Sequence, residues 1–163
     1  MRVALTGTPG TGKSSVASEL ARRGYHVVSL DRLAEERKLI VGIDAARGTR
    51  EVDVEALDRE IDVRVKLGFL VGHYAHLLTA DLAVVLRCHP KVLEERLRAR
   101  GWAEAIDVIT QEAVARLPLV FEVETTRATP AASADAVLGI LQGRTAGHEP
   151  GRLDWSAEVL SWY

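Results

Sequence analysis

Eight consecutive residues near the start of the chain combine three glycines, a lysine and a hydroxyl side chain at a spacing suited to holding phosphate. They read Gly7-Thr8-Pro9-Gly10-Thr11-Gly12-Lys13-Ser14 and fit the pattern G-x-x-x-x-G-K-[ST] without a mismatch. Glycines let successive backbone N–H groups approach phosphate oxygens with no Cβ in between. Lys13 can reach the β- and γ-phosphates of a nucleotide, and the Ser14 hydroxyl can ligate Mg²⁺. The motif therefore predicts a nucleoside triphosphate site with Ser14 on the metal and nucleotide contacts from Gly10, Thr11, Gly12, Lys13, Ser14 and Ser15.

The segments on either side of this loop have the periodicity that such a site needs. Residues 2–6 form a short β-type run, and residues 13–23 have helical spacing, with Val16, Leu20 and Ala21 on one face. The helix would direct the positive end of its dipole at the bound anion. A glycine-rich turn that binds nothing is the alternative interpretation, and the ordered succession of strand, loop, Lys-Ser pair and helix disfavours it.

Composition limits the other classes of function. The 163 residues are 47% hydrophobic, which suits one domain with a core, and the formal net charge of −2 gives no direct signal for nucleic acid. The single cysteine, Cys88, excludes an intramolecular disulfide, and its apolar neighbours favour a buried residue over a nucleophile. Because we find no signal peptide, membrane-spanning run or lipidation motif, we expect a soluble cytoplasmic protein.

Short apolar runs alternate with helical patterns along the rest of the chain. We predict strands at 25–29, 69–71, 82–87 and 120–124, and helices at 31–38, 54–66, 90–100, 105–117 and 129–142. Asp53 is placed to cap the helix that begins at Val54, whereas residues 39–50 show neither period and are predicted to be irregular. Wholly apolar strands between helices predict an α/β fold with a parallel five-stranded sheet flanked by helices.

The C-terminal part has a different composition. Residues 143–151 hold three glycines and a proline, so we predict a linker after a domain that spans residues 1–142. In residues 152–163, one helical stripe carries Trp155, Val159, Trp162 and Tyr163. We expect this aromatic helix to pack on the domain, and a surface for a partner is the alternative.

Four stretches in this order resemble the P-loop nucleoside monophosphate kinases, and more narrowly the archaeal and nuclear branch called adenylate kinase isoenzyme six. They are residues 6–15, residues 42–57, the run Gly72-His73-Tyr74-Ala75-His76-Leu77, and residues 84–102. The resemblance spans most of residues 1 to 126, and its last two stretches are the more specific ones.

The resemblance implies an enzyme that transfers the γ-phosphate of ATP to AMP with Mg²⁺. It assigns residues 30–53 to binding of the acceptor nucleoside monophosphate (NMP) and a segment near residues 99–108 to a lid over ATP, with Arg100 contacting ATP. Lys13 and Arg100 are then the expected catalytic residues, since phosphoryl transfer depends on positioning and charge neutralisation.

Two departures from the family pattern bear on activity. Val71 stands where these kinases usually carry an acid that holds the waters around Mg²⁺, and Asp31 and Asp53 are the candidates to replace it. The lid is shorter by roughly two helical turns. Both features favour reduced transfer, or a bias toward ATP hydrolysis.

Other polar residues keep more than one interpretation. His73 and His76 either position nucleotide or water, or serve structure, and a metal site is the weakest reading because no carboxylate or thiol lies nearby in sequence. Arg96 and Arg98 are either charge-neutralising groups or solvated helix charges.

Two functions from different classes therefore stand side by side. The first is the adenylate kinase-like enzyme. The second, also implied by the resemblance, is an ATP-dependent factor for small ribosomal subunit maturation whose nucleotide cycle controls its binding to a ribosomal protein. A small-metabolite kinase on the same fold is a weaker third, since the stretches 72–77 and 87–102 favour the nucleotide branch.

Overall fold

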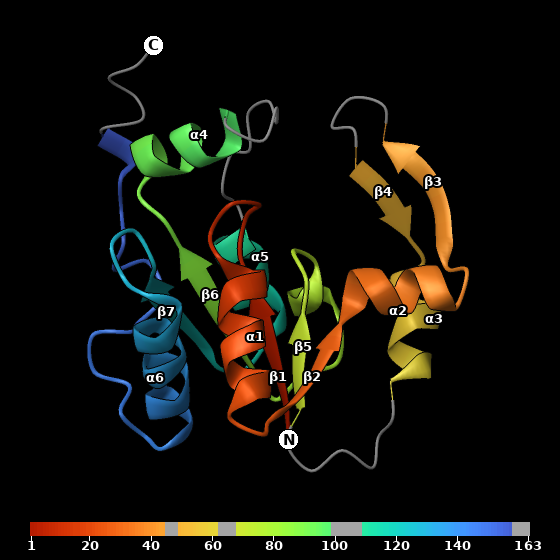
Figure 1. The fold of residues 1–163 in the computed structure, drawn as a ribbon, viewed down its shortest axis with the longest axis horizontal. Coiled ribbons are helices and arrows are strands. Elements are labelled where there is room, and N and C mark those ends of the chain that lie inside the picture. Colours follow the sequence, from red (N-terminus) through yellow and green to blue (C-terminus); the bar gives the residue numbers. More distant parts are fainter. Residues whose placement is uncertain (45–48, 62–67, 99–108, 158–163) are drawn as a thin grey trace.

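A five-stranded parallel sheet forms the centre of the computed structural model, which describes residues 1–44, 49–61, 68–98 and 109–157 (Figure 1). In spatial order the strands are β2 (His26–Ser29), β5 (Gly68–Val71), β1 (Arg2–Thr6), β6 (Leu82–Arg87) and β7 (Val120–Glu124). All four neighbouring pairs run parallel. The predicted P-loop NTPase fold is confirmed.

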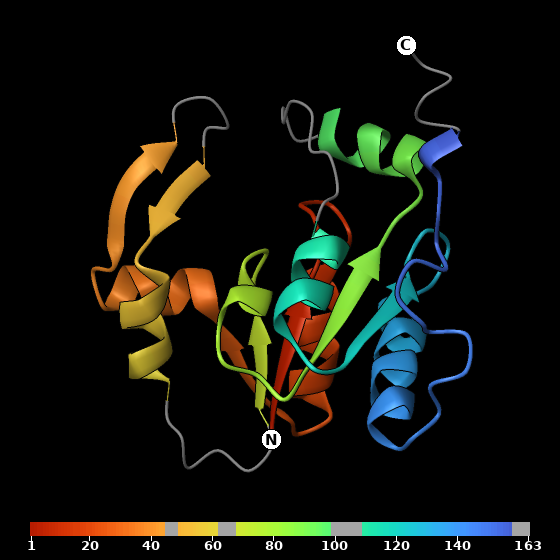
Figure 2. The same ribbon diagram turned by 180° about the vertical axis from the view of Figure 1, so that it is seen from behind.

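Helices cover both faces of this sheet (Figures 1 and 2). The helices are α1 (Lys13–Arg22), α2 (Leu30–Glu36), α3 (Val54–Glu60), α4 (Pro90–Arg98), α5 (Ile109–Arg116) and α6 (Pro130–Leu141), with a short 3₁₀ turn η1 (Ala75–Leu77). One apolar layer joins α1 and α6 to the sheet, and the other joins α2, α3, α5 and η1 to it.

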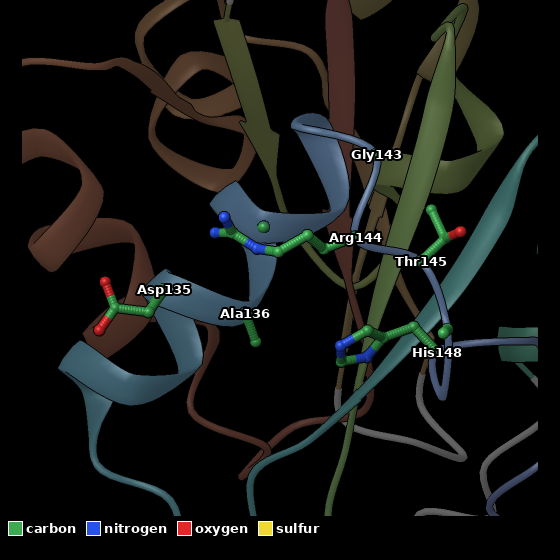
Figure 3. Close-up of a pocket in the computed structure, with 8 residues that line it drawn as sticks. Asp135, Ala136, Gly143, Arg144, Thr145 and His148 are labelled. Carbon is green, nitrogen blue, oxygen red and sulfur yellow. The ribbon is translucent and has the colours of Figure 1, made fainter.

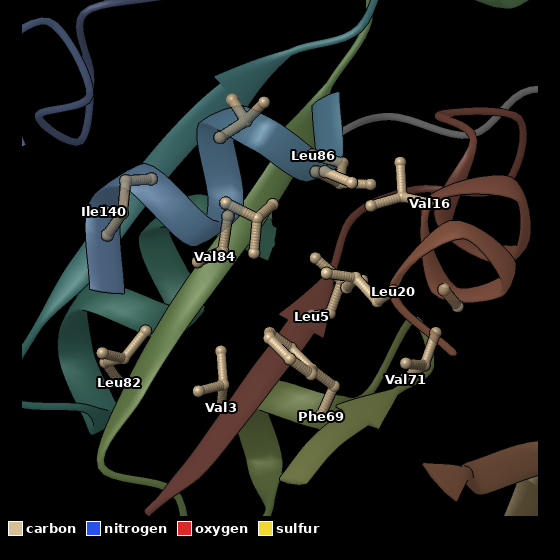
Figure 4. Packing of buried hydrophobic residues seen from close by; sticks show 14 residues of the cluster. Val3, Leu5, Val16, Leu20, Phe69, Val71, Leu82, Val84, Leu86 and Ile140 are labelled. Carbon is tan, nitrogen blue, oxygen red and sulfur yellow. The ribbon is translucent and has the colours of Figure 1, made fainter. Parts of the chain in front are cut away.

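Strand β1 shows why the central strands are continuous apolar runs. Val3 and Leu5 enter the layer under α1 and α6, whereas Ala4 between them enters the opposite layer (Figure 4). All three side chains are fully buried. A strand covered on both faces has no solvent side for a polar residue, so its sequence does not alternate.

Helix starts follow the capping chemistry of the sequence. The Asp53 side chain accepts a hydrogen bond from the backbone N–H of Ala56 at 2.9 Å, which confirms the predicted cap of α3. The sequence predicts a helix that includes Thr129, but Thr129 is the N-cap of α6, because its hydroxyl accepts from the N–H of Ala132 at 3.1 Å.

The prediction of irregular structure for residues 39–50 is wrong. Strands β3 (Ile40–Asp44) and β4 (Thr49–Val52) pair antiparallel as a separate two-stranded sheet. The register shifts between Ile40 and Gly42, and this irregularity broke the period-two pattern in the sequence. Val41 and Ile43 are 68% and 72% exposed, so no buried face marked the strands either.

The segment after α6, predicted as a linker, lies along the outer edge of β7. The N–H of Glu122 donates to the carbonyl of His148 at 2.8 Å, and the His148 ring and the Glu122 carbonyl form a second contact of 2.8 Å. These bonds cover an otherwise open sheet edge. A shallow hollow of about 510 Å³ lies between α6 and residues 143–148, and no residue of the phosphate loop lines it (Figure 3).

A largely buried ion pair binds the chain beyond that segment to the sheet. Arg87 at the end of β6 donates to the Glu122 carboxylate at 2.6 Å and to the Leu153 carbonyl at 3.2 Å, and the N–H of Leu153 donates to the same carboxylate at 3.2 Å. The Arg87 guanidinium lies 5.3 Å from the centre of the Trp155 ring, and the centre of the His89 ring lies 5.5 Å from the same point. Trp155 is thus in contact with the domain, while residues 158–163 of the predicted aromatic helix lie outside the described residues.

Candidate active site

The loop of residues 7–14 connects the carboxyl end of β1 to the start of α1 (Figure 1). Gly7 and Gly10 have φ angles of 139° and 87°, in the region that favours glycine. A Cβ on Gly7 would lie 2.4 Å from the carbonyl oxygen of Leu86, and one on Gly10 would lie 2.9 Å from Cδ1 of Leu93. The backbone path of the loop therefore depends on glycine at both positions.

The Lys13 side chain folds back over the loop. Its Nζ donates to the carbonyl oxygens of Gly7 at 2.6 Å and Thr8 at 2.8 Å. The ammonium group thus lies over the loop that leads into the N-terminus of α1, whose first turn has no acidic residue. Two sources of positive potential coincide there, as an anion site requires.

Three further side chains hold the carbonyl groups of the loop. The Thr11 hydroxyl donates to the Thr8 carbonyl at 2.8 Å, and the Thr125 hydroxyl donates to the Thr11 carbonyl at 2.8 Å. Arg96 on α4 donates to the Gly10 carbonyl at 3.3 Å and to the Thr126 carbonyl at 3.1 Å. Arg96 is therefore a structural contact of the loop and not a solvated helix charge; a charge-neutralising role for it stays a prediction.

The remaining residues predicted for the site are placed as follows. Ser14 and Ser15 are exposed in the first turn of α1. Cys88 is buried as predicted, and burial raises the pKa of its thiol. Arg100, the lid at residues 99–108 and the side chain of Arg98 lie outside the described residues.

No acidic side chain comes from the end of β5. Val71 is buried in the layer under α1. Asp53 is occupied as the cap of α3. Asp31, in the first turn of α2, lies close enough to affect the titration of both His73 and Tyr74, so it is the better placed of the two candidate carboxylates.

His73 lies between charges of both signs. Burial lowers the pKa of His73, Asp31 opposes that shift, and Lys13 and His76 add to it. The ring is 4.7 Å from that of Tyr74 and perpendicular to it, and burial together with Asp31 raises the pKa of the tyrosine hydroxyl. The motif after β5 is thus brought beside the phosphate loop.

His76 has a different environment from His73. It is 2% exposed, with Nδ1 at 3.3 Å from the Thr6 hydroxyl and Nε2 at 3.0 Å from the Glu112 carboxylate. Burial lowers the pKa of His76, while Glu112 opposes the shift. Both ring nitrogens have protein partners, so the two histidines do not form a metal pair. The sequence does not predict the role of Glu112, because it lies 36 positions after His76 and no local pattern indicates the contact.

Comparison with known proteins agrees with this geometry. Residues 3–114 match the family described as AAA domain. A protein of Archaeoglobus fulgidus named "Putative adenylate kinase" is 42% identical over 172 aligned residues, covering 98% of this chain and 94% of the relative. One of Methanothermobacter thermautotrophicus with the same name is 36% identical, covering 97% and 99%.

Solved structures share the fold at lower identity. A shikimate kinase from Acinetobacter baumannii in complex with shikimate has a TM-score of 0.57 at 16% identity, covering 89% of this chain and 94% of that one. A deoxyadenosine kinase from M. mycoides has a TM-score of 0.52 at 15% identity, covering 88% and 100%. At such identities the likeness concerns the fold alone. The sequence matches carry the assignment further: the chain belongs to the P-loop kinase family of the archaeal proteins named "Putative adenylate kinase".

Proposed function

We propose that this protein is an adenylate kinase-like enzyme that transfers the γ-phosphate of ATP to AMP. The observation that carries the proposal is the position of Lys13, whose ammonium group is held over a glycine loop at the N-terminus of α1. Family membership supports a phosphotransferase, and the name of the relatives supports AMP as the acceptor.

The acceptor would bind to the unit formed by α2, the β3–β4 hairpin and α3. In both views the hairpin and α4 rise at the end of the sheet where the phosphate loop lies (Figures 1 and 2). Three described arginines of the unit are each paired with a glutamate: Arg32 with Glu36, Arg37 with Glu60, and Arg50 with Glu35. Exposed pairs of this kind are weak, so their arginines remain available to an incoming phosphate.

The side chains fit a Mg²⁺ ion that is bound together with the nucleotide. Ser14 offers one hydroxyl, and Mg²⁺ in such sites takes most of its ligands from phosphates and water. In the part of the chain that the structure describes, no group of three or more His, Cys, Asp or Glu residues could hold a metal alone. When bound, Mg²⁺ would neutralise charge on the phosphates. Asp31 is the carboxylate we propose for orienting its water ligands.

Each residue of the chain then has a defined task. Lys13 neutralises charge on the transferred phosphate, and the glycine loop orients its oxygens. Arg100 is proposed to contact ATP from the lid. Closure of the acceptor unit and the lid excludes water, so that the AMP oxygen is the nucleophile.

A coupled assay with Mg-ATP, run with and without each nucleoside monophosphate, tests this function. ADP formation that depends on AMP is expected. Lys13→Ala should remove it with little change in thermal unfolding, whereas Arg152→Ala, a 62% exposed arginine on the C-terminal segment, should keep it. Full activity in Lys13→Ala would refute the assignment of the loop.

The second candidate is an ATP-dependent assembly factor that acts on a protein of the small ribosomal subunit. The exposed Val41 and Ile43 on the hairpin favour it, since an apolar pair on a projecting strand suits a protein contact. Its signature in the same assay is slow phosphate release without an acceptor, accelerated by the ribosomal protein. A cytoplasmic location is proposed for either function. No helix within the described ranges is long and apolar enough to span a membrane.

A further inference from the structure

Three polar side chains from distant parts of the sequence form one hydrogen-bonded chain beside the phosphate loop. Thr6 is the last residue of β1 and directly precedes Gly7, His76 lies in η1, and Glu112 lies on α5. The distances are 3.3 Å from the Thr6 hydroxyl to Nδ1 of His76 and 3.0 Å from Nε2 to the Glu112 carboxylate. Thr6 and His76 are 0% and 2% exposed, and the exposed Glu112 closes the chain at the surface.

The protons of this chain can be assigned from its partners. Glu112 as a carboxylate only accepts, so Nε2 of a neutral His76 carries the proton and donates it. Nδ1 is then an acceptor facing the Thr6 hydroxyl. That hydroxyl has one proton and two acceptors in reach, Nδ1 of His76 and the carbonyl of His73 at 3.0 Å. The hydroxyl donates to one of these acceptors at a time, and through them Thr6 connects the end of β1 to His73 and His76.

The chain is not a nucleophilic triad. Thr6 is fully buried, so no substrate reaches its hydroxyl. What the chain fixes is the turn between β5 and η1. That turn is also tied to β1 by the Gly72 N–H, which donates to the Leu5 carbonyl at 3.3 Å. His73 lies in this tethered turn, close enough to Lys13 and Asp31 for both to affect its pKa.

We propose that His76 is a positioning residue: held by Glu112 and Thr6, it fixes the turn that sets His73 against Lys13 for phosphoryl transfer. The inference rests on the proposed function for the reaction it serves. It adds to that function a link from the surface of α5 to the entry of the phosphate loop. A misplacement of about 1 Å can cost about 100-fold in rate, so such a link has a measurable effect.

Two matched pairs of variants test the link through kinetics. Thr6→Val removes the hydroxyl and keeps the shape, and Thr6→Ser restores the hydroxyl. Glu112→Ala removes the acceptor, and Glu112→Gln restores a neutral acceptor. We expect kcat to fall about 10- to 100-fold in Thr6→Val and Glu112→Ala, with KM for ATP changed less than about 3-fold. Thr6→Ser and Glu112→Gln should stay within about 5-fold of the wild type in kcat.

The control is Val114→Ala, an exposed position on the same helix as Glu112. It should leave kcat unchanged. Thermal unfolding of every variant identifies those that fail to fold. Because Glu112 is exposed, its variants remain folded even where Thr6→Val does not.

Nitrogen-15 spectra of the histidine rings keep this inference separable from the proposed function. In the wild type we expect the Nε2–H tautomer at His76. In Thr6→Val and Glu112→Ala the pKa of His73 should move toward that of an ordinary histidine, since a displaced ring loses the burial, and to a lesser extent the effect of Lys13, that lower it. If the wild type transfers no phosphate, the proposed function fails, and these spectra still decide whether His76 sets the position of His73.

An Nδ1–H tautomer at His76, or an unmoved His73 titration in both variants, would overturn the proposal. So would unchanged kcat in both variants of an active enzyme.

Discussion

Arg96 offers the sharpest test of how the phosphate loop is supported. Its guanidinium donates to the Gly10 carbonyl at 3.3 Å, the Thr126 carbonyl at 3.1 Å and, at the limit of hydrogen bonding, the Thr125 carbonyl at 3.5 Å. One side chain thus joins the loop to the connection between β7 and α6. Arg96→Met keeps the apolar stem and removes every one of these donors. Arg96→Lys keeps the charge but presents a point donor instead of a planar fork.

The size of the effect follows from these contacts. Hydrogen bonds to charged groups contribute about 1.5–3 kcal/mol each, and the lengths here place both main bonds at the lower end. The site is half-buried, so water replaces part of what is lost. A loss of about 1–2 kcal/mol remains for Arg96→Met. Since 1.4 kcal/mol is a factor of ten, Kd for ATP should rise about 5- to 30-fold.

Isothermal titration with Mg-ATP measures this Kd directly. Glu95→Ala, an exposed neighbour on the same helix, is the matched control and should leave Kd unchanged. Arg96→Lys is expected between the two. An Arg96→Met protein that unfolds at the normal temperature and binds ATP within twofold of the wild type would refute the reasoning.

Three further outcomes are expected. Gly7→Ala should lower the free energy of unfolding by more than about 2 kcal/mol and abolish ATP binding, because its Cβ would clash with the Leu86 carbonyl oxygen. The control is Gly24→Ala: Gly24 has a φ of 86° but open space around it, so this variant should lose only about 1 kcal/mol. Glu122→Ala should cost about 3–5 kcal/mol, read as a lower Tm, because the largely buried Arg87 guanidinium loses the carboxylate that neutralises its charge; an unchanged Tm would contradict this. The pKa of His76 is lowered on folding, so the unfolded chain binds a proton first and the free energy of unfolding falls as pH drops below about 6.5. Urea unfolding at pH 7.5 and 5.5 should show a smaller fall in His76→Gln than in the wild type, and equal falls would refute the assignment.

The sheet and the phosphate loop were predictable because local chemistry determines them. Apolar runs such as residues 82–87 are strands buried on both faces, and no helix or loop satisfies that pattern in so short a length. The loop motif fixes glycine, lysine and serine at positions that have one known use. The cap at Asp53 follows from one side chain and one N–H three residues later.

The features that were missed depend on distant contacts or lack a buried face. The β3–β4 hairpin has exposed apolar residues and a register shift at Gly42, so neither periodicity nor burial revealed it. The Gly and Pro residues of 143–151 predicted a loop correctly in composition, but not that His148 would pair with the edge of β7. The pairing of Glu112 with His76, and of Arg96 with Gly10, arises only when the chain is folded.

These distant contacts share one physical purpose at the phosphate loop. A loop that binds an anion with its N–H groups must direct its carbonyl oxygens elsewhere, and each of those needs a donor. Lys13 donates to the carbonyls of Gly7 and Thr8, and Arg96 donates to that of Gly10. The Thr125 hydroxyl donates to the Thr11 carbonyl, and the Thr11 hydroxyl is a second donor to Thr8. Of these donors only Lys13 is the one expected to turn toward a phosphate. When it does, the Thr8 carbonyl keeps the Thr11 hydroxyl, and the supports from Arg96 and Thr125 stay in place. The loop can therefore release its lysine to the substrate without losing its shape, and for this reason Arg96→Met should weaken ATP binding although Arg96 itself touches only protein.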